Sequence, residues 1–464
     1  MKLQSGKCFK ILAVFACLVA CVVSAQFMRA EYVFQMLHEF FPTNGAPAYL
    51  SCALIEGGDG NFYGATGAYP GNSGYASGGT IFKISPSGLL TVIYSFDGSG
   101  SNGLGPAGLT FGSNGSFYGV TAEGPFSPGY QAIGDGTVFK VTTNGVLTRL
   151  AIFDGFTNGG LPSSPLIQTE TGEFYGVTEE TVFKVTTNGV LTTLVFFDQT
   201  NGFDPRVTGL TRGNNGAFYG ATRLSLGGPA FNGTIFRITT DGVFTNLFYF
   251  NGTNGRAPTG LCKGTNGLFY GTTGRGGSAD SGTVFTMTED GALTTLVSFP
   301  GTDGRQPYGN IIQGRDGNFY GAATSGTNYG TLFKMTPGGE LSTIVYFDGT
   351  NGLHPFARFT LTSDGNLYGA LADIDKKLTL DGNAGVVFRL VEPPNLTISR
   401  SAGSVKLSWT SFTNGIYRLE KNSSWDSTNW TSVSSNVTAT GNSTSFTNAT
   451  AGAAQEFYRV VLLP

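Results

Sequence analysis

Charged side chains and metal-binding side chains are scarce in this sequence. Charged residues make up 12% of the 464 positions, about half of the ~25% that is usual. The net charge is −3 and no cluster of Lys or Arg is present, so the sequence argues against a nucleic-acid partner, which requires a basic surface. Only two histidines occur, His38 and His354. A zinc site is therefore not expected, and we expect no other metal or cofactor.

Long apolar runs are also lacking, except at the N-terminus. Three lysines precede the apolar stretch Ile11–Val23, which is short for a membrane span and is followed by the small residues Ser24 and Ala25. This pattern predicts a signal peptide over residues 1–25. The alternative is a bacterial lipobox ending in Cys21, which would then carry a lipid. Both interpretations predict export, with no transmembrane segment in the mature chain.

Cysteine is rare in the part of the chain that would remain after cleavage. Of five cysteines, only Cys52 and Cys262 lie beyond residue 25. They occupy the same strand type in two different repeats, so no disulfide is expected.

Glycine, by contrast, is abundant. The chain contains 71 glycines, roughly twice the usual ~7%, without the G-X-Y period of collagen. Aromatic residues reach 13%, which supplies enough apolar surface for a folded core. Many short strands joined by tight turns would explain both features.

A repeating pattern of four β-rich runs accounts for most of the chain. The most regular run is an aromatic pair followed by glycine, with Leu-Tyr in place of Phe-Tyr in the last copy; it starts at Phe62, Phe117, Phe174, Phe218, Phe269, Phe319 and Leu367. A second run follows at Thr80–Lys83, Thr137–Lys140, Thr181–Lys184, Thr234–Arg237, Thr283–Thr286, Thr331–Lys334 and Val386–Arg389. A third follows at Leu90–Phe96, Leu147–Phe153, Leu191–Phe197, Phe244–Phe250, Leu293–Phe299 and Leu341–Phe347. A looser run precedes each aromatic pair, as in Ala48–Ile55 and Gly209–Arg212.

Four strands in a unit of about 50 residues are typical of a propeller blade. The third run is missing after the seventh aromatic pair, but Tyr32–Phe40, before the first unit, has the same spacing of Leu37 and Phe40. We therefore predict an all-β, seven-bladed β-propeller over residues 31–391, in which the N-terminal strand completes the last blade. The alternative is an open β-solenoid, which has no reason to divide one repeat between its two ends.

The connections predict which face of the ring carries function. Asp-Gly or Asn-Gly joins the first two strands in six of the seven units, as expected for tight hairpins. The loops between the second and third strands vary widely, and variable loops on a rigid scaffold commonly carry binding residues. The candidate ligand-binding residues are Tyr69, Tyr75, Phe126, Tyr130, Phe231, Arg275 and Tyr329. Aromatic side chains with Arg can form a platform for carbohydrate or peptide. For each residue, packing within its own loop is the alternative.

Beyond the ring, residues 392–394 form a linker and residues 395–464 are rich in Ser, Thr and Asn. Alternating runs around Trp409 predict a small β-sandwich there.

The repeat resembles that of Gloeobacter- and Verrucomicrobia-type bacterial proteins, with its DGNFYGxT…GTVFKxTxxGxLTxLxxF pattern; Asp316–Phe347 follows it closely. The resemblance implies an exported protein, in a family whose members carry one of several C-terminal anchor segments. The ending Tyr458–Pro464 has neither an apolar span nor a basic tail, so no such anchor is expected. The C-terminal module resembles a fibronectin type III domain. The resemblance implies no established activity and no catalytic residue.

Two further interpretations of the acidic residues remain open. Four aspartates begin loops that follow the third run: Asp97, Asp154, Asp198 and Asp348. They could bind Ca²⁺ or could cap turns through their own side chains, and the absence of D-x-D-x-D spacing favours capping.

For function, we predict a monomeric, non-enzymatic, secreted or surface-exposed binding protein for an extracellular glycan or protein. The alternatives are an extracellular polysaccharide-active enzyme and a purely structural surface protein.

Overall fold

The computed structural model is all-β and divides into two units, residues 34–390 and a unit that contains residues 391–464. It describes residues 33–40, 49–50, 52–67, 77–97, 100–124, 135–198, 200–205, 209–224, 232–301, 304–307, 309–325, 329–348, 355, 359–371, 385–391, 396–401, 404–411, 416–424, 429–441, 443–449 and 456–462. Within these ranges every regular element is a strand. No helix there is long and apolar enough to cross a membrane.

The larger unit consists of antiparallel sheets that repeat one strand order, here called positions a to d. Position a contains β2 (Tyr49–Leu50), β3 (Ile55–Glu56), β7 (Leu104–Phe111), β11 (Ile167–Gln168), β15 (Leu210–Arg212), β19 (Arg256–Lys263), β23 (Arg305–Pro307), β24 (Ile312–Gln313) and β28 (Thr360–Leu361). Position b contains β4 (Phe62–Gly67), β8 (Phe117–Glu123), β12 (Phe174–Val177), β16 (Phe218–Thr222), β20 (Phe269–Arg275), β25 (Phe319–Ser325) and β29 (Leu367–Leu371). Position c contains β5 (Ser77–Ile84), β9 (Thr137–Val141), β13 (Thr181–Val185), β17 (Thr234–Ile238), β21 (Thr283–Met287), β26 (Thr331–Met335) and β30 (Val386–Val391). Position d contains β6 (Leu90–Asp97), β10 (Leu147–Ile152), β14 (Leu191–Phe196), β18 (Phe244–Tyr249), β22 (Leu293–Ser298), β27 (Leu341–Tyr346) and β1 (Val33–Glu39).

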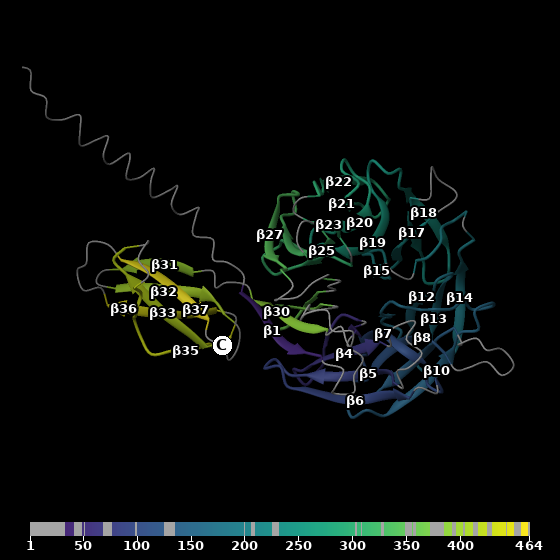
Figure 1. Cartoon of the computed structure of the whole chain (residues 1–464), viewed down its shortest axis with the longest axis horizontal. Helices are drawn as coiled ribbons and strands as arrows, with labels where there is room; N and C mark the ends of the chain where they lie inside the picture. The colour runs from purple at the N-terminus through teal and green to yellow at the C-terminus, as the bar shows by residue number, and fades with distance from the viewer. Residues whose placement is uncertain are drawn as a thin grey trace, which may run out of the picture. The chain divides into compact units, whose positions relative to one another are not determined.

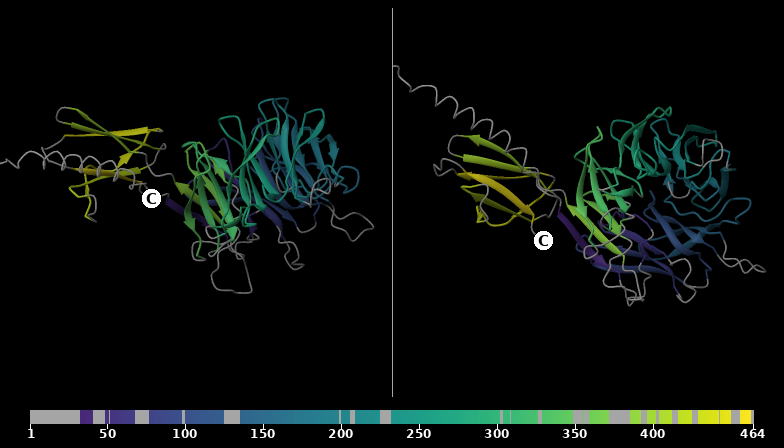
Figure 2. Two further views of the ribbon diagram at one scale, coloured as in Figure 1. Left: turned by 90° about the horizontal axis from the view of Figure 1, so that it is seen from above. Right: turned by 45° about the horizontal axis from the view of Figure 1, so that its top comes forward.

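We number these sheets 1 to 7 by their position b strands, from β4 to β29. In Figures 1 and 2 they follow one another around a common centre, with position d strands such as β6, β14 and β22 at the periphery. Sheet 7 takes its outer strand from the other end of the chain, because β1 is hydrogen bonded to β30. The strand expected over Tyr32–Phe40 is therefore present and lies beside the expected partner.

The prediction of one strand over Ala48–Ile55 is wrong. Two short strands, β2 and β3, pair with β4 on either side of a break that contains Cys52. In sheets 2 and 5 the corresponding strands β7 and β19 stay continuous, and a register shift absorbs the irregularity. Cys52 and Cys262 are free thiols, in sheets 1 and 5.

The aromatic pairs hold neighbouring sheets together, because adjacent residues of a strand point to opposite faces. Phe62 and Tyr63 are both buried, and Tyr63 contacts Phe117 of the next sheet. The contacts of this kind, with ring-centroid distances, are Tyr63–Phe117 (4.2 Å), Tyr118–Phe174 (4.1 Å), Tyr175–Phe218 (4.5 Å), Tyr219–Phe269 (4.4 Å) and Tyr270–Phe319 (4.0 Å). The prediction that these aromatics pack between units, rather than bind sugars, agrees with these contacts.

The same contact joins sheet 7 to sheet 1. The ring centroids of Tyr368 and Phe62 are 4.2 Å apart. Those of Phe40, which directly follows β1, and Phe82 are 5.2 Å apart. Phe40 thereby repeats the contact that Phe153 makes with Phe183 at 5.0 Å. One hydrophobic cluster accordingly contains buried residues of both the first and the last sheet.

The C-terminal unit contains two sheets around one core. The first sheet contains β31 (Leu396–Ser401), β32 (Ser404–Thr410) and β36 (Ser443–Ala449), and the second contains β33 (Ile416–Asn422), β34 (Thr431–Ser432), β35 (Val437–Thr438) and β37 (Phe457–Leu462). Trp409 is 1% exposed and shares its cluster with Leu407, Tyr417 and Leu419.

Candidate functional site

The connections of the ring lie on two faces with different character. The a–b and c–d hairpins lie on one face, here called the turn face, and the b–c and d–a connections lie on the other, here called the loop face. All seven a–b hairpins place a glycine at φ between 74° and 87°, from Gly60 to Gly365. These are the left-handed conformations that the Asp-Gly and Asn-Gly pairs predict.

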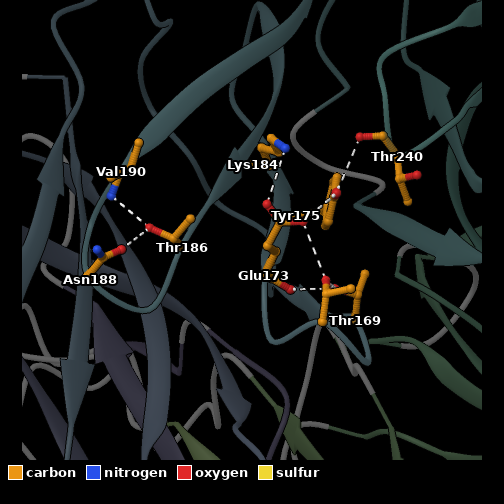
Figure 3. Close-up of polar contacts among 9 residues, drawn as sticks. Thr169, Glu173, Tyr175, Lys184, Thr186, Asn188, Val190 and Thr240 are labelled. Carbon is orange, nitrogen blue, oxygen red and sulfur yellow. Dashed lines mark hydrogen bonds and ion pairs between the residues drawn. The ribbon is translucent and has the colours of Figure 1, made fainter.

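Polar side chains of the turn face are hydrogen bonded to other groups of the protein. The hydroxyl of Tyr175 donates to the backbone oxygen of Thr240 in the next sheet (3.3 Å), and Lys184 contacts Glu173 (3.2 Å), as Figure 3 shows. In the neighbouring c–d hairpin, the backbone N–H of Val190 donates to the hydroxyl of Thr186 (3.0 Å). Because these groups are paired in a repeated manner, they stabilise the scaffold and leave little for a ligand.

The hairpin of sheet 6 gives a pH-dependent example. The carboxylate of Asp316 accepts hydrogen bonds from Lys334 (2.6 Å), Tyr320 (2.9 Å) and the backbone of Asn318 (3.1 Å). Burial raises the pKa of Asp316, but the hydrogen bonds from Lys334 and Asn318 outweigh burial and leave this pKa lowered. Its contribution to stability is therefore present above its ordinary pKa and is lost as the pH falls through the lowered value.

We expect Asp316→Ala to lower the free energy of unfolding by roughly 1–3 kcal/mol near neutral pH, because it leaves polar partners unsatisfied. Urea denaturation should show that this loss shrinks as the pH falls below the ordinary pKa of 3.8. The matched control is Asn266→Ala, since Asn266 donates to Tyr270 (3.0 Å) at the same repeat position and does not titrate. If the loss in free energy of unfolding did not depend on pH for either variant, the stabilising role of the Asp316 carboxylate would be contradicted.

On the loop face, strained backbone lies at or before the position a strands of four sheets, sheets 3 to 6. The residue before a proline has a positive φ at Leu161 (54°), Asp204 (58°), Ala257 (51°) and Gln306 (53°). Such a conformation costs of order 1–3 kcal/mol and is further disfavoured before proline. Neighbouring sheets compensate through hydrogen bonds: the N–H groups of Leu161, Ala257 and Gln306 donate to backbone oxygens of Asp135 (2.7 Å), Asn232 (2.9 Å) and Ser281 (2.9 Å).

Most sequence-predicted ligand residues lie outside the described residues. These are Tyr69, Tyr75, Phe126, Tyr130 and Phe231. The other two are on the loop face and are exposed: Arg275 ends β20, and Tyr329, 45% exposed, precedes β26. They belong to neighbouring sheets 5 and 6, but no interaction between them is observed. Whether the seven residues converge therefore stays a prediction.

The loop of sheet 5 is described throughout and contains residues that the prediction missed. The carboxylate of Asp280 accepts hydrogen bonds from Arg256 (3.1 and 2.7 Å) and from the backbone N–H of Gly276 (2.8 Å). These interactions, the Arg256 contact first, lower the pKa of Asp280. The signal was present in the sequence: Gly255-Arg256-Ala257-Pro258 and Gly304-Arg305-Gln306-Pro307 place an arginine at the same position of successive repeats.

Two of the candidate calcium residues, Asp154 and Asp198, cap turns through their own side chains. Asp154 accepts hydrogen bonds from the backbone N–H groups of Phe156 (2.9 Å), Thr157 (2.7 Å) and Asn158 (3.1 Å). Asp198 does the same with Thr200 (3.0 Å) and Asn201 (3.2 Å). Among the described residues, no group of three His, Cys, Asp or Glu side chains could hold a metal ion. Asp97 and Asp348 also take part in interactions within the protein.

Asp154 also influences a second carboxylate on this face. Burial and the charge of Asp154 raise the pKa of Asp135. The hydrogen bonds of Asp154 outweigh its own burial and lower its pKa to about 2. A Cβ placed on Gly155 would lie 2.3 Å from the Asp135 carboxylate, so this group lies directly beside the loop that Asp154 begins.

The repeat model of one bacterial family matches residues 25–225 and 178–388 of the chain. The chain belongs to the Gloeobacter/Verrucomicrobia repeat family. The family match covers all seven position b strands, so the repeat that defines the family is the repeat that builds the sheets. Among curated proteins no match was found.

One solved structure with a TM-score above 0.5 supports the propeller-like fold of this family member. The extracellular domain of a putative hybrid two-component system from B. thetaiotaomicron is 12% identical, with a TM-score of 0.51, over 94% of this chain and 59% of that one. A gluconolactonase from Xanthomonas campestris is 14% identical, with a TM-score of 0.37, over 62% and 86% of the two chains. A putative oxidoreductase (glucose dehydrogenase) from Thermus thermophilus is 16% identical, with a TM-score of 0.39, over 78% and 100%. At these identities the similarity concerns the fold and not the activity.

Proposed function

We propose that this protein is an exported, monomeric, non-enzymatic seven-bladed β-propeller whose loop face binds an extracellular glycan or peptide. A fibronectin type III-like module follows the ring. Export is supported by the signal-peptide pattern of residues 1–25, which lie outside the described residues, and by similarity to an extracellular domain. The observation that carries the binding role is the contrast between the uniform, hydrogen-bonded hairpins of the turn face and the b–c loops of varied length on the loop face, where Arg275 and Tyr329 are exposed.

Closure of the ring is supported by three contacts that repeat elsewhere. Ser363 donates its backbone N–H to Glu56 (2.7 Å), just as Ser113 does to Gln168 (2.8 Å). Thr360 donates to the backbone oxygen of Leu54, as Thr211 does to that of Leu261. The Tyr368–Phe62 contact is the third. A junction that repeats the internal contacts covers the apolar faces of the first and last blades, which an open ring would leave exposed.

An extracellular polysaccharide-active enzyme is the second candidate, and one observation favours it. The pKa of Asp135 is raised while that of Asp154 is lowered. Carboxyl groups whose pKa values are pushed apart are suited to the roles of general acid and general base.

The test is binding of the mature protein, from residue 26, to glycan and peptide arrays. We expect binding that is lost in Tyr69→Ala with Tyr130→Ala, and retained in Val146→Ala, which removes an exposed side chain from the turn face. Equal loss in both variants, or no binding to any array component, would contradict the proposed site. Shortened glycan products that disappear in Asp135→Asn would establish the enzyme instead.

A further inference from the structure

Three arginines lie at the loop-face ends of strands in the neighbouring sheets 5 and 6. Arg256 begins β19 and Arg275 ends β20, and the two residues lie directly opposite one another in the ladder. Arg305 begins β23, which is the equivalent position in the next sheet. Arg305 is near the same loop: a Cβ on Gly301 would lie 3.0 Å from the Ser281 hydroxyl and 3.1 Å from Nε of Arg305.

This arrangement concentrates positive charge in a chain that has little of it. Like charges directly opposite in a sheet are destabilising, and the equivalent pairs elsewhere, Leu104 with Glu123 and Arg305 with Ser325, avoid them. Among the described residues, Asp280 is the one carboxylate that forms an ion pair with any of these arginines, and its partner is Arg256. The three arginines with Asp280 therefore carry a net charge of 3 − 1 = +2. The whole chain, by contrast, has a net charge of −3.

Asp280 occupies only one of the three guanidinium groups. It binds Arg256 through two hydrogen bonds and, through Gly276, fixes the loop that follows Arg275. Arg275 is exposed. No hydrogen bond of its guanidinium is seen within the described part of the chain, and its positive charge contributes to the lowered pKa of Asp280. The exposed Arg305 is oriented by its Nε, which donates to the backbone oxygen of Gly301 (3.1 Å). The guanidinium groups of Arg275 and Arg305, on neighbouring sheets, thus have N–H donors available for a ligand.

We propose that Arg275 and Arg305 form a binding subsite for the carboxylate groups of an acidic polysaccharide. The planar guanidinium binds carboxylates through paired hydrogen bonds, and Arg256 with Asp280 shows this geometry in the same cluster. Two arginines on adjacent sheets suit a polymer that presents carboxylates repeatedly. A nucleic acid would require a basic stripe that tracks its backbone, which the composition of the chain does not supply. This inference rests on the proposed binding function of the loop face.

The experiment measures binding of the full mature protein to polygalacturonate. We expect Arg275→Ala with Arg305→Ala to weaken binding about tenfold or more, with reduced dependence on salt, because charge-assisted hydrogen bonds are lost. Arg275→Lys should weaken it less, since it keeps the charge without the fork. The control Arg149→Ala removes an exposed arginine from β10, at the same cost in net charge per substitution, and should leave binding unchanged. Thermal denaturation confirms that each variant is folded.

The ligand has a matched control as well. Polygalacturonate whose carboxyl groups are reduced to alcohols should not bind, and neutral dextran should not bind. Binding of dextran sulfate or single-stranded DNA in preference to polygalacturonate would overturn the carboxylate assignment, as would equal loss in the Arg149 control. If polygalacturonate fails but other array glycans or peptides bind, only this subsite is wrong. If nothing binds, the proposed function fails with it.

Discussion

Phe40→Ala should lower the free energy of unfolding by about 3–5 kcal/mol, the usual cost of truncating a buried Phe. Phe40 lies just beyond β1, is 1% exposed and packs on Phe82 of sheet 1. Its backbone N–H donates to Gly385 (2.9 Å), before β30. One residue therefore links the N-terminal strand to both the last and the first sheet. Chemical denaturation of the mature protein measures the loss.

Two control variants are needed to interpret the result for Phe40→Ala. Met36→Ala changes an exposed side chain of the same strand, 50% exposed, and should cost less than about 0.5 kcal/mol. Phe153→Ala removes the equivalent ring between sheets 2 and 3 and should cost as much as Phe40→Ala. If Phe40→Ala behaved like Met36→Ala, the junction between the last and first sheets would not be a packed interface, and closure would be wrong.

Gly282→Ala should destabilise the protein by roughly 2–6 kcal/mol, the sum of two costs. Gly282 has φ 101°, a conformation that a residue with a Cβ rarely adopts, and strain of this kind costs of order 1–3 kcal/mol. A Cβ would also lie 2.4 Å from the backbone oxygen of Thr273 and 2.6 Å from Cδ of Pro307. Relieving that overlap costs about another 1–3 kcal/mol. The contact with Pro307 joins sheets 5 and 6, so the melting temperature should fall with it.

Gly317→Ala separates the two causes. Gly317 has φ 78° in an Asp-Gly hairpin, and a Cβ there would meet nothing within 4 Å. We expect only the conformational cost of about 1–2 kcal/mol. Equal losses for Gly282→Ala and Gly317→Ala would show that the close approach of Pro307 contributes nothing to the stability of the interface.

The candidate site was less predictable than the strands. The aromatic pair of each unit marked position b, because alternation and β-branched neighbours determine a strand locally. Of the arginine cluster and its carboxylate, only Arg275 was predicted from the sequence, and Arg256, Arg305 and Asp280 were missed. Arg256 and Arg275 are 275 − 256 = 19 positions apart in sequence and meet through strand register, which depends on how the hairpin pairs.

The sequence alone determined the all-β class, the repeated strands, the tight turns and the place of the N-terminal strand. These features follow from side-chain alternation, from Asp-Gly and Asn-Gly pairs and from counting the runs of each unit. Only the tertiary structure decided which aromatic ring contacts which, why Gly282 has no room for a side chain, and how three arginines are placed at the same end of two neighbouring sheets. Such contacts join segments from different repeats, and their geometry is set by the packing of one sheet on the next, which no local pattern encodes.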